Sequence, residues 1–193
     1  CYHGHVDSLL VKSGSGALTL GIAASKGIPK ETVAPTITLE FNNKVELIKA
    51  FKKYGDDIAA IFVEPIAGNM GCIPASFDFL ETAKNLAKEY GSLLVFDEVM
   101  TGFGRLGTPM GHEALQFTPD IIAAGKGLGG GYVPIGGVYC RPDVVAPIAE
   151  TDLALMFYTF AGHDLCCAVA KKVLEIVRAE NLIDRARIMG ELL

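Results

Sequence analysis

Two side chains in this sequence stand where covalent chemistry on a bound cofactor could take place. Lys126 follows the largely apolar run DIIAA and lies in the glycine-rich sequence GKGLGGG. Asp97, 29 residues earlier, ends the apolar run LLVF. A lysine amine can form a Schiff base with an aldehyde, and a carboxylate can hold a pyridine nitrogen in its protonated form. A lysine and an aspartate, each at the carboxyl end of a buried strand, therefore predict a site for pyridoxal 5′-phosphate (PLP).

Apolar runs of two kinds alternate along the chain and indicate the elements that must position these side chains. Short continuous runs predict strands at 58–63, 93–96, 120–124 and 135–139. Apolar residues at helical spacing predict helices at 44–54, 77–90 and 164–179. The alternation is typical of α/β proteins with a mostly parallel sheet and helices on both faces. In such sheets the ligand binds beyond the carboxyl ends of the strands, where Asp97 and Lys126 are expected to lie.

The composition excludes several classes of protein. Half of the 193 residues are hydrophobic and 20% are charged, which is typical of a globular protein and not of a disordered one. A net charge of −5 without a basic cluster argues against a nucleic-acid or anionic-membrane partner. No apolar run approaches the roughly 18 residues of a membrane span. Five cysteines without CxxC spacing favour reduced thiols and a cytoplasmic location.

Both ends of the sequence look cut. It begins at Cys1 without a methionine, and residues 180–193 follow a helical pattern that has no stop signal. We therefore expect a longer parent chain.

Five motifs occur in the order that resembles class III PLP-dependent aminotransferases. They are VEPIAGN (63–69), FDEVMTGFGR (96–105), PDIIAAGKGLGGG (119–131), PIGG (134–137) and YTFAGH (158–163). The first 21 residues resemble the glutamate-1-semialdehyde 2,1-aminomutase branch of this class. The resemblance covers nearly the whole chain and implies PLP fold type I. Residues 1–193 would be the central, cofactor-binding large domain, and residues 180–193 would begin the C-terminal small domain.

The resemblance implies a role for each of three residues in the second half of the chain. Lys126 would form the Schiff base and then carry protons between the substrate α-carbon and the cofactor. Asp97 would pair with the pyridine nitrogen, and Val99 would press on the face of the ring. From the residues alone, Lys126 could instead be a solvated loop lysine, Asp97 a helix cap or salt-bridge partner, and Val99 a core residue. Glu98 is expected to order the local network.

The resemblance also implies roles for three residues in predicted loops. Asn69 would donate a hydrogen bond to the ring hydroxyl oxygen, and Tyr2 would stack on the ring. Thr159 would bind the cofactor phosphate of the neighbouring subunit, which implies a homodimer. Without the resemblance, these would be an ordinary turn residue, a terminal tyrosine and a loop threonine. Many class III enzymes have glutamine where this chain has Met100, and Asn69 with Met100 matches the aminomutase branch.

The function that follows is transfer of an amino group between a small-molecule amino donor and a keto acid or aldehyde. The first alternative is the intramolecular reaction of the aminomutase. A dehydrogenase is a second alternative, since Gly125, Gly127 and Gly130 fit a dinucleotide-binding GxGxxG, provided that a helix starts there. A remnant without catalysis is a third. Cys1, His3 and His5 make only a weak metal-site pattern, and no metal is expected.

Overall fold

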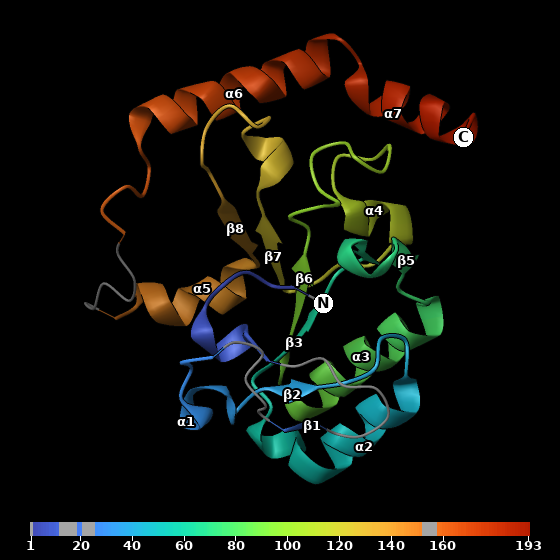
Figure 1. Ribbon diagram of the computed structural model, residues 1–193, viewed down its shortest axis with the longest axis vertical. Helices are drawn as coiled ribbons and strands as arrows, with labels where there is room; N and C mark the ends of the chain where they lie inside the picture. The colour runs from blue at the N-terminus through green and yellow to red at the C-terminus, as the bar shows by residue number, and fades with distance from the viewer. Residues whose placement is uncertain (1, 12–18, 21–25, 152–157) are drawn as a thin grey trace. The chain divides into compact units, whose positions relative to one another are not determined.

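The structure is a computed structural model that describes residues 2–11, 19–20, 26–151 and 158–193 (Figure 1). The chain forms two compact units, Cys1–Leu94 and Val95–Leu193, which are considered separately below. Strand β6 (Leu93–Asp97) begins in the first unit and continues into the second. Asp97 and Lys126 both belong to the second unit.

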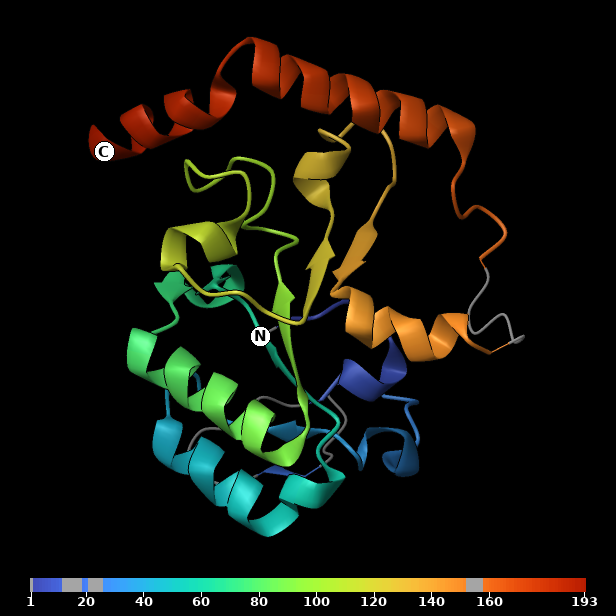
Figure 2. The same ribbon diagram turned by 180° about the vertical axis from the view of Figure 1, so that it is seen from behind.

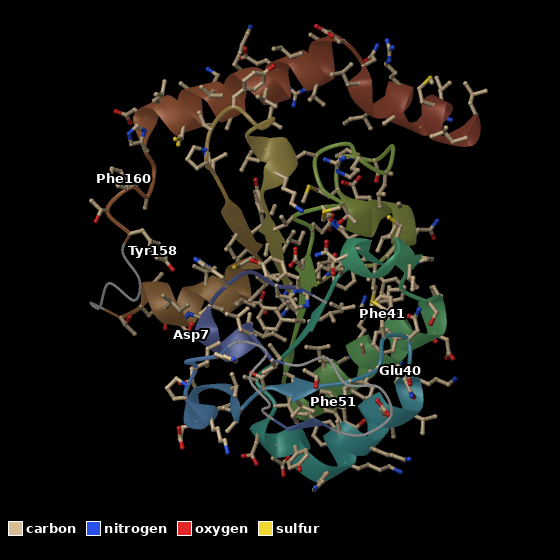
Figure 3. All side chains as sticks on the ribbon, viewed as in Figure 1. Asp7, Glu40, Phe41, Phe51, Tyr158 and Phe160 are labelled. Atoms are coloured by element: carbon tan, nitrogen blue, oxygen red, sulfur yellow. The ribbon has the colours of Figure 1, made fainter. Side chains whose placement is uncertain are left out.

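Two amphipathic helices, α2 (Lys44–Tyr54) and α3 (Phe77–Tyr90), pack against each other in the first unit (Figures 1 and 2). Phe51 of α2 and Leu80 of α3 are almost completely buried, and the Phe51 and Tyr90 rings lie 5.3 Å apart (Figure 3). Burial of these large side chains forms the core of the unit.

Local signals explain where these two helices begin and end. The Asn43 side chain accepts a hydrogen bond from the Glu46 N–H at 3.1 Å, and the Ser76 hydroxyl accepts one from the Phe79 N–H at 3.3 Å. Each bond satisfies a donor that the first helical turn leaves unpaired. Helix α3 ends at Tyr90 and is followed by Gly91, whose φ of 70° favours a residue without a side chain.

The rest of the first unit consists of short elements. They are η1 (Asp7–Leu9), β1 (Thr19–Leu20), α1 (Lys30–Val33), β2 (Ile37–Thr38), η2 (Gly55–Asp57), β3 (Ala60–Val63), β4 (Ile66–Ala67), η3 (Gly68–Met70) and β5 (Ile73–Pro74). Strands β1 and β2 pair antiparallel, and so do β4 and β5. Because β4 and β5 flank η3, their pairing holds the turn that carries Asn69. Strand β3 lies beside the start of β6, where the Leu93 N–H donates to the Ala59 carbonyl at 2.9 Å.

The second unit contains the strands that carry the predicted chemistry. Strand β6 pairs in parallel with β7 (Ile121–Ala124), and β7 pairs antiparallel with β8 (Gly137–Cys140). The strand order is β3-β6-β7-β8, and β3 is joined to β6 through α3, the type of crossover that parallel strands require. The expected α/β fold with a mostly parallel sheet is confirmed.

Besides these strands, the second unit contains helical segments. They are α4 (Gly111–Leu115), η4 (Lys126–Leu128), α5 (Pro142–Ala149), α6 (Asp164–Ala179) and α7 (Leu182–Glu191). Helix α6 passes the end of β7 and contacts η4 (Figure 2). A Cβ placed on Gly130 would lie 3.1 Å from Val173 of α6, so the glycine allows the loop to lie close to this helix.

The helices predicted at 44–54, 77–90 and 164–179 are confirmed to the residue. The strand boundaries differ by a few residues, for reasons of pairing. The Ile58 N–H donates to the Gly55 carbonyl and is held in a turn, so β3 begins at Ala60. Gly137 pairs with Ala124, the last residue of β7, so β8 begins at 137 and not at 135.

Candidate active site at the ends of two parallel strands

Asp97 and Lys126 lie at the carboxyl ends of neighbouring strands, as predicted. Asp97 is the last residue of β6 and is opposite Ala123 in the parallel register. Lys126 follows the end of β7 by two residues. Parallel strands that end together bring the residues after them to one edge of the sheet, where a ligand can contact both.

The backbone of Lys126 has an unusual conformation. Its φ of 35° lies in the left-handed region, which costs a residue with a side chain on the order of 1 kcal/mol. The side chain is exposed, and Nζ lies 2.6 Å from Sδ of Met100. Strain of this kind is typical of residues whose position is fixed by function.

Glycines on both sides of Lys126 allow the loop to approach the chain that follows β6. A Cβ on Gly125 would contact the methyl groups of Val99 at 3.7 and 3.8 Å. A Cβ on Gly127 would lie 3.1 Å from Cβ of Phe103. The structure thus brings Val99 beside the residue that precedes Lys126, and its predicted contact with the cofactor ring stays a prediction.

The Asp97 side chain is half-buried and bonds to its own loop. Its Oδ1 accepts a hydrogen bond from the Val99 N–H at 3.0 Å. This i to i+2 bond is an Asx-type turn, which fixes the direction of the chain immediately after β6. Asp97 therefore fixes the position of Val99 and also supplies a carboxylate at the strand end.

Glu98 is completely buried and is the centre of a hydrogen-bond network. Its Oε1 accepts from the His112 N–H at 3.0 Å and lies 2.7 Å from Nδ1 of the His112 ring. Its Oε2 accepts from the Gly111 N–H and, at 3.4 Å, from the Thr101 hydroxyl. The network expected around Glu98 is confirmed. His112 was not predicted, because nothing in the sequence indicates that a residue 14 positions away faces Glu98.

Two predicted cofactor residues, Asn69 and Tyr2, lie in the first unit, and both are exposed. Asn69 is in the η3 turn, where the Gly68 N–H donates to Oε2 of Glu64 at 3.2 Å. Glu64 is buried, and its Oε1 has no hydrogen-bond partner among the described residues. The buried carboxylate of Glu64 therefore anchors the turn that presents Asn69.

Thr159 lies in an exposed turn that leads into α6. The turn is closed by a hydrogen bond from the Ala161 N–H to the Tyr158 carbonyl at 2.9 Å. Tyr158 and Phe160 on either side are also exposed (Figure 3). Thr159 is thus placed on the surface of the second unit, and its predicted contact with a neighbouring subunit stays a prediction.

The requirement for a dinucleotide site is not met. The GxGxxG segment would need to start an α-helix. Instead, η4 has three residues and is followed by turns and irregular backbone up to β8. Within the described ranges, no group of three or more His, Cys, Asp or Glu side chains could hold a metal ion, and Cys1 of the weak metal-site pattern lies outside these ranges. No helix of the described segments is both long and apolar enough to cross a membrane.

The sequence is similar to those of glutamate-1-semialdehyde 2,1-aminomutases. It is 42% identical over 185 residues to the glutamate-1-semialdehyde 2,1-aminomutase of Pelotomaculum thermopropionicum, covering 96% of this chain. It is 46% identical over 178 residues to that of Aquifex aeolicus, covering 92% of this chain. The chain spans 42% of the length of each of these relatives.

Solved structures of transaminases share the fold. A transaminase from the marine bacterium Virgibacillus superposes with a TM-score of 0.75 at 33% identity, covering 80% of this chain and 37% of that one. The ornithine aminotransferase of Toxoplasma gondii, which has partial occupancy of PLP at its active site, gives a TM-score of 0.71 at 34% identity. That match covers 80% of this chain and 35% of the other.

The family model named Aminotransferase class-III matches residues 1–193. Together with the strand-end lysine and aspartate, this match shows that the chain belongs to the class III aminotransferases, a PLP-dependent family of enzymes.

Proposed function

We propose that this chain forms the cofactor-binding part of an enzyme that transfers amino groups on PLP, with Lys126 as the covalent residue. The observation that carries the proposal is the geometry of Lys126. A strained lysine backbone follows β7, beside the strand that ends at Asp97. The substrates would be a small amino donor and a keto acid or aldehyde.

The residues present fit the cofactor. One amine and one carboxylate lie at neighbouring strand ends, and the glycines on either side of Lys126 let its loop pack closely against Val99 and Phe103. When bound, PLP supplies an electron sink for the bonds at the substrate carbon that bears nitrogen. The chain would supply the rest: Lys126 Nζ holds the cofactor and moves the proton at that carbon, while Asp97 keeps the ring nitrogen protonated.

Four further residues would complete the proposed site. We propose that Asn69 donates to the ring oxygen and that Tyr2 covers one face of the ring, while Val99 covers the other. Thr159 would bind the cofactor phosphate of a second copy of the chain, so the active enzyme would be a homodimer. The proposal is supported by the exposure of Asn69, Tyr2 and Thr159, because an exposed side chain is accessible to a ligand.

The intramolecular reaction is the second candidate, and one observation favours it. The curated relatives with 42% and 46% identity are aminomutases, whereas the transaminase structures have 33% and 34% identity. The reaction would move the amino group of glutamate 1-semialdehyde from one carbon to its neighbour. Met100, which contacts Lys126 and matches the aminomutase branch, supports this candidate.

The lysine assignment can be tested on the full-length protein loaded with PLP. We expect visible absorbance from a covalent lysine link and, after borohydride reduction, a cofactor mass on the peptide that contains Lys126. Lys126→Ala should lose both signals, whereas Lys171→Ala, which removes an exposed lysine of the same unit, should keep them. Labelling of any other lysine in the wild-type protein would refute the assignment.

A labelled substrate separates the two candidate reactions. Glutamate 1-semialdehyde with a ¹⁵N amino group is supplied without any second substrate. Conversion to 5-aminolevulinate that retains the label would establish the intramolecular reaction. Turnover only after addition of a separate amino donor and acceptor would establish the general transaminase.

A further inference from the structure

The loop between β6 and α4 contains the side chains that contact the lysine loop. Met100 Sδ contacts Lys126 Nζ, Val99 lies beside Gly125, and Phe103 lies beside Gly127. All of these contacts come from the residues directly after Asp97. The position of Lys126 therefore depends on what holds this loop in place.

Glu98 holds the loop at both ends. At the start, its N–H donates to the Ala123 carbonyl at 2.7 Å and so extends the pairing between β6 and β7. At the far end, its carboxylate accepts the backbone N–H groups of Gly111 and His112. The segment 99–110 is thereby closed by one side chain.

The residues around Gly111, at the far end of this loop, are tightly packed. A Cβ at this position would lie 2.6 Å from Cβ of Thr101 and 2.9 Å from Oε2 of Glu98. Such distances leave no space for a side chain. Only glycine allows the backbone N–H to reach the carboxylate while Thr101 packs against it.

We infer that Glu98 is a positioning residue for Lys126, acting through the loop that it closes. This inference rests on the proposed role of Lys126. Through Gly111, His112 and Thr101, the carboxylate fixes the 99–110 loop, and the loop fixes Met100 against the lysine amine. A substitution at Glu98 should therefore change the environment of Lys126 without any direct contact between the two side chains.

Glu98→Gln is the sharpest substitution, because it replaces a single carboxylate oxygen by an NH₂ group and keeps the shape of the side chain. Each carboxylate oxygen accepts from a backbone N–H, one from Gly111 and the other from His112. In either orientation, the glutamine NH₂ would face a backbone N–H, and two donors cannot bond to each other. Glu113→Gln is the matched control. It removes an exposed carboxylate from α4, the helix whose first two N–H groups Glu98 binds, and this carboxylate accepts from the Met110 N–H at 3.1 Å.

The readout is the reactivity of Lys126 toward an amine-acylating reagent in the full-length, cofactor-free protein. Labelling of Lys126 is measured by mass spectrometry relative to Lys171, whose side chain is 80% exposed. We expect Glu98→Gln to raise the relative rate at Lys126 by roughly tenfold, since lost bonds to a charged group release the loop and its methionine. Glu113→Gln should leave the ratio within about twofold, because exposed contacts contribute little.

The outcomes are distinct. A selective rise at Lys126 supports the inference, and an unchanged ratio in a folded Glu98→Gln variant overturns it. If all lysines become more reactive together, the variant has unfolded, and His112→Ala then decides. His112→Ala keeps the backbone bond to Oε1 and removes only the ring, so a smaller selective rise supports the inference and no rise overturns it. Because no cofactor is used, failure of borohydride labelling at Lys126 would refute the proposed function independently of this result.

Discussion

The two units each bury a glutamate directly after a strand, but the two carboxylates are paired very differently. Glu98, after β6, accepts hydrogen bonds from two backbone N–H groups and a hydroxyl and contacts an imidazole nitrogen. Glu64, after β3, accepts one backbone N–H, and its other oxygen has no partner among the described residues. Burial of a carboxylate is costly unless hydrogen bonds replace water.

The difference shows that burial alone does not indicate what a carboxylate does. Glu98 joins segments 13 and 14 residues away, so it organises tertiary structure. Glu64 bonds to Gly68, four residues on, and organises a single turn. We therefore expect the same substitution, glutamate to glutamine, to have a large effect in the second unit and a small one in the first.

The largest effect on stability is expected for Glu98→Gln. Opposed donors and the loss of charge-assisted bonds should lower the free energy of unfolding by about 3 kcal/mol. Urea denaturation of the full-length protein measures this change. A loss below about 1 kcal/mol would show that the four contacts of Glu98 add little to folding.

Gly111→Ala should have the next largest effect. The added methyl group overlaps Thr101 and the Glu98 carboxylate, and overpacking of this kind costs about 2 kcal/mol. The double variant with Glu98→Gln should lose less free energy of unfolding than the sum of the two single losses, because both substitutions break the same contact. Full additivity in the denaturation measurement would argue against a shared network.

Ser76→Ala measures what one local polar contact in the first unit contributes to stability, for comparison with the contacts of Glu98. Loss of the hydroxyl that caps α3 should cost about 1 kcal/mol. Ser76→Thr retains a hydroxyl and should cost less. Equal losses for both variants would show that the cap bond does not contribute.

The smallest effect is expected for Glu64→Gln. The glutamine side chain keeps an oxygen that can accept from the Gly68 N–H, while its NH₂ group takes the place of the oxygen that has no partner among the described residues. Removing a buried charge that is only partly hydrogen-bonded also favours folding, so the free energy of unfolding should change by less than about 1 kcal/mol. A loss of stability as large as that of Glu98→Gln would show that the two buried glutamates do not differ in their contribution to folding.

Much of the fold could be predicted because its signals are local. Asn43, Ser76 and Gly91 delimit helices whose apolar spacing is regular, and the predicted bounds are confirmed. Helix α4 was missed because its five residues carry little periodicity and its first N–H groups are satisfied by Glu98, 13 residues earlier in the chain. Helix α5 contains Pro147, which argues against a helix in any local analysis.

The candidate site divides in the same way. Lys126 and Asp97 were found because a charged residue at the end of an apolar run is a signal within the sequence itself. His112 and the contact between Met100 and Lys126 depend on how loops fold back, which no spacing rule describes. From the sequence, transfer between two substrates ranks first, whereas the curated relatives at 42% and 46% identity are aminomutases.

The left-handed backbone of Lys126 has a consequence for the stability of the protein. Glycine or asparagine would adopt this conformation more readily than lysine. Replacing Lys126 by either should therefore raise the free energy of unfolding by on the order of 1 kcal/mol while abolishing the proposed reaction. Selection for stability alone would thus remove the residue that we propose carries out amino transfer.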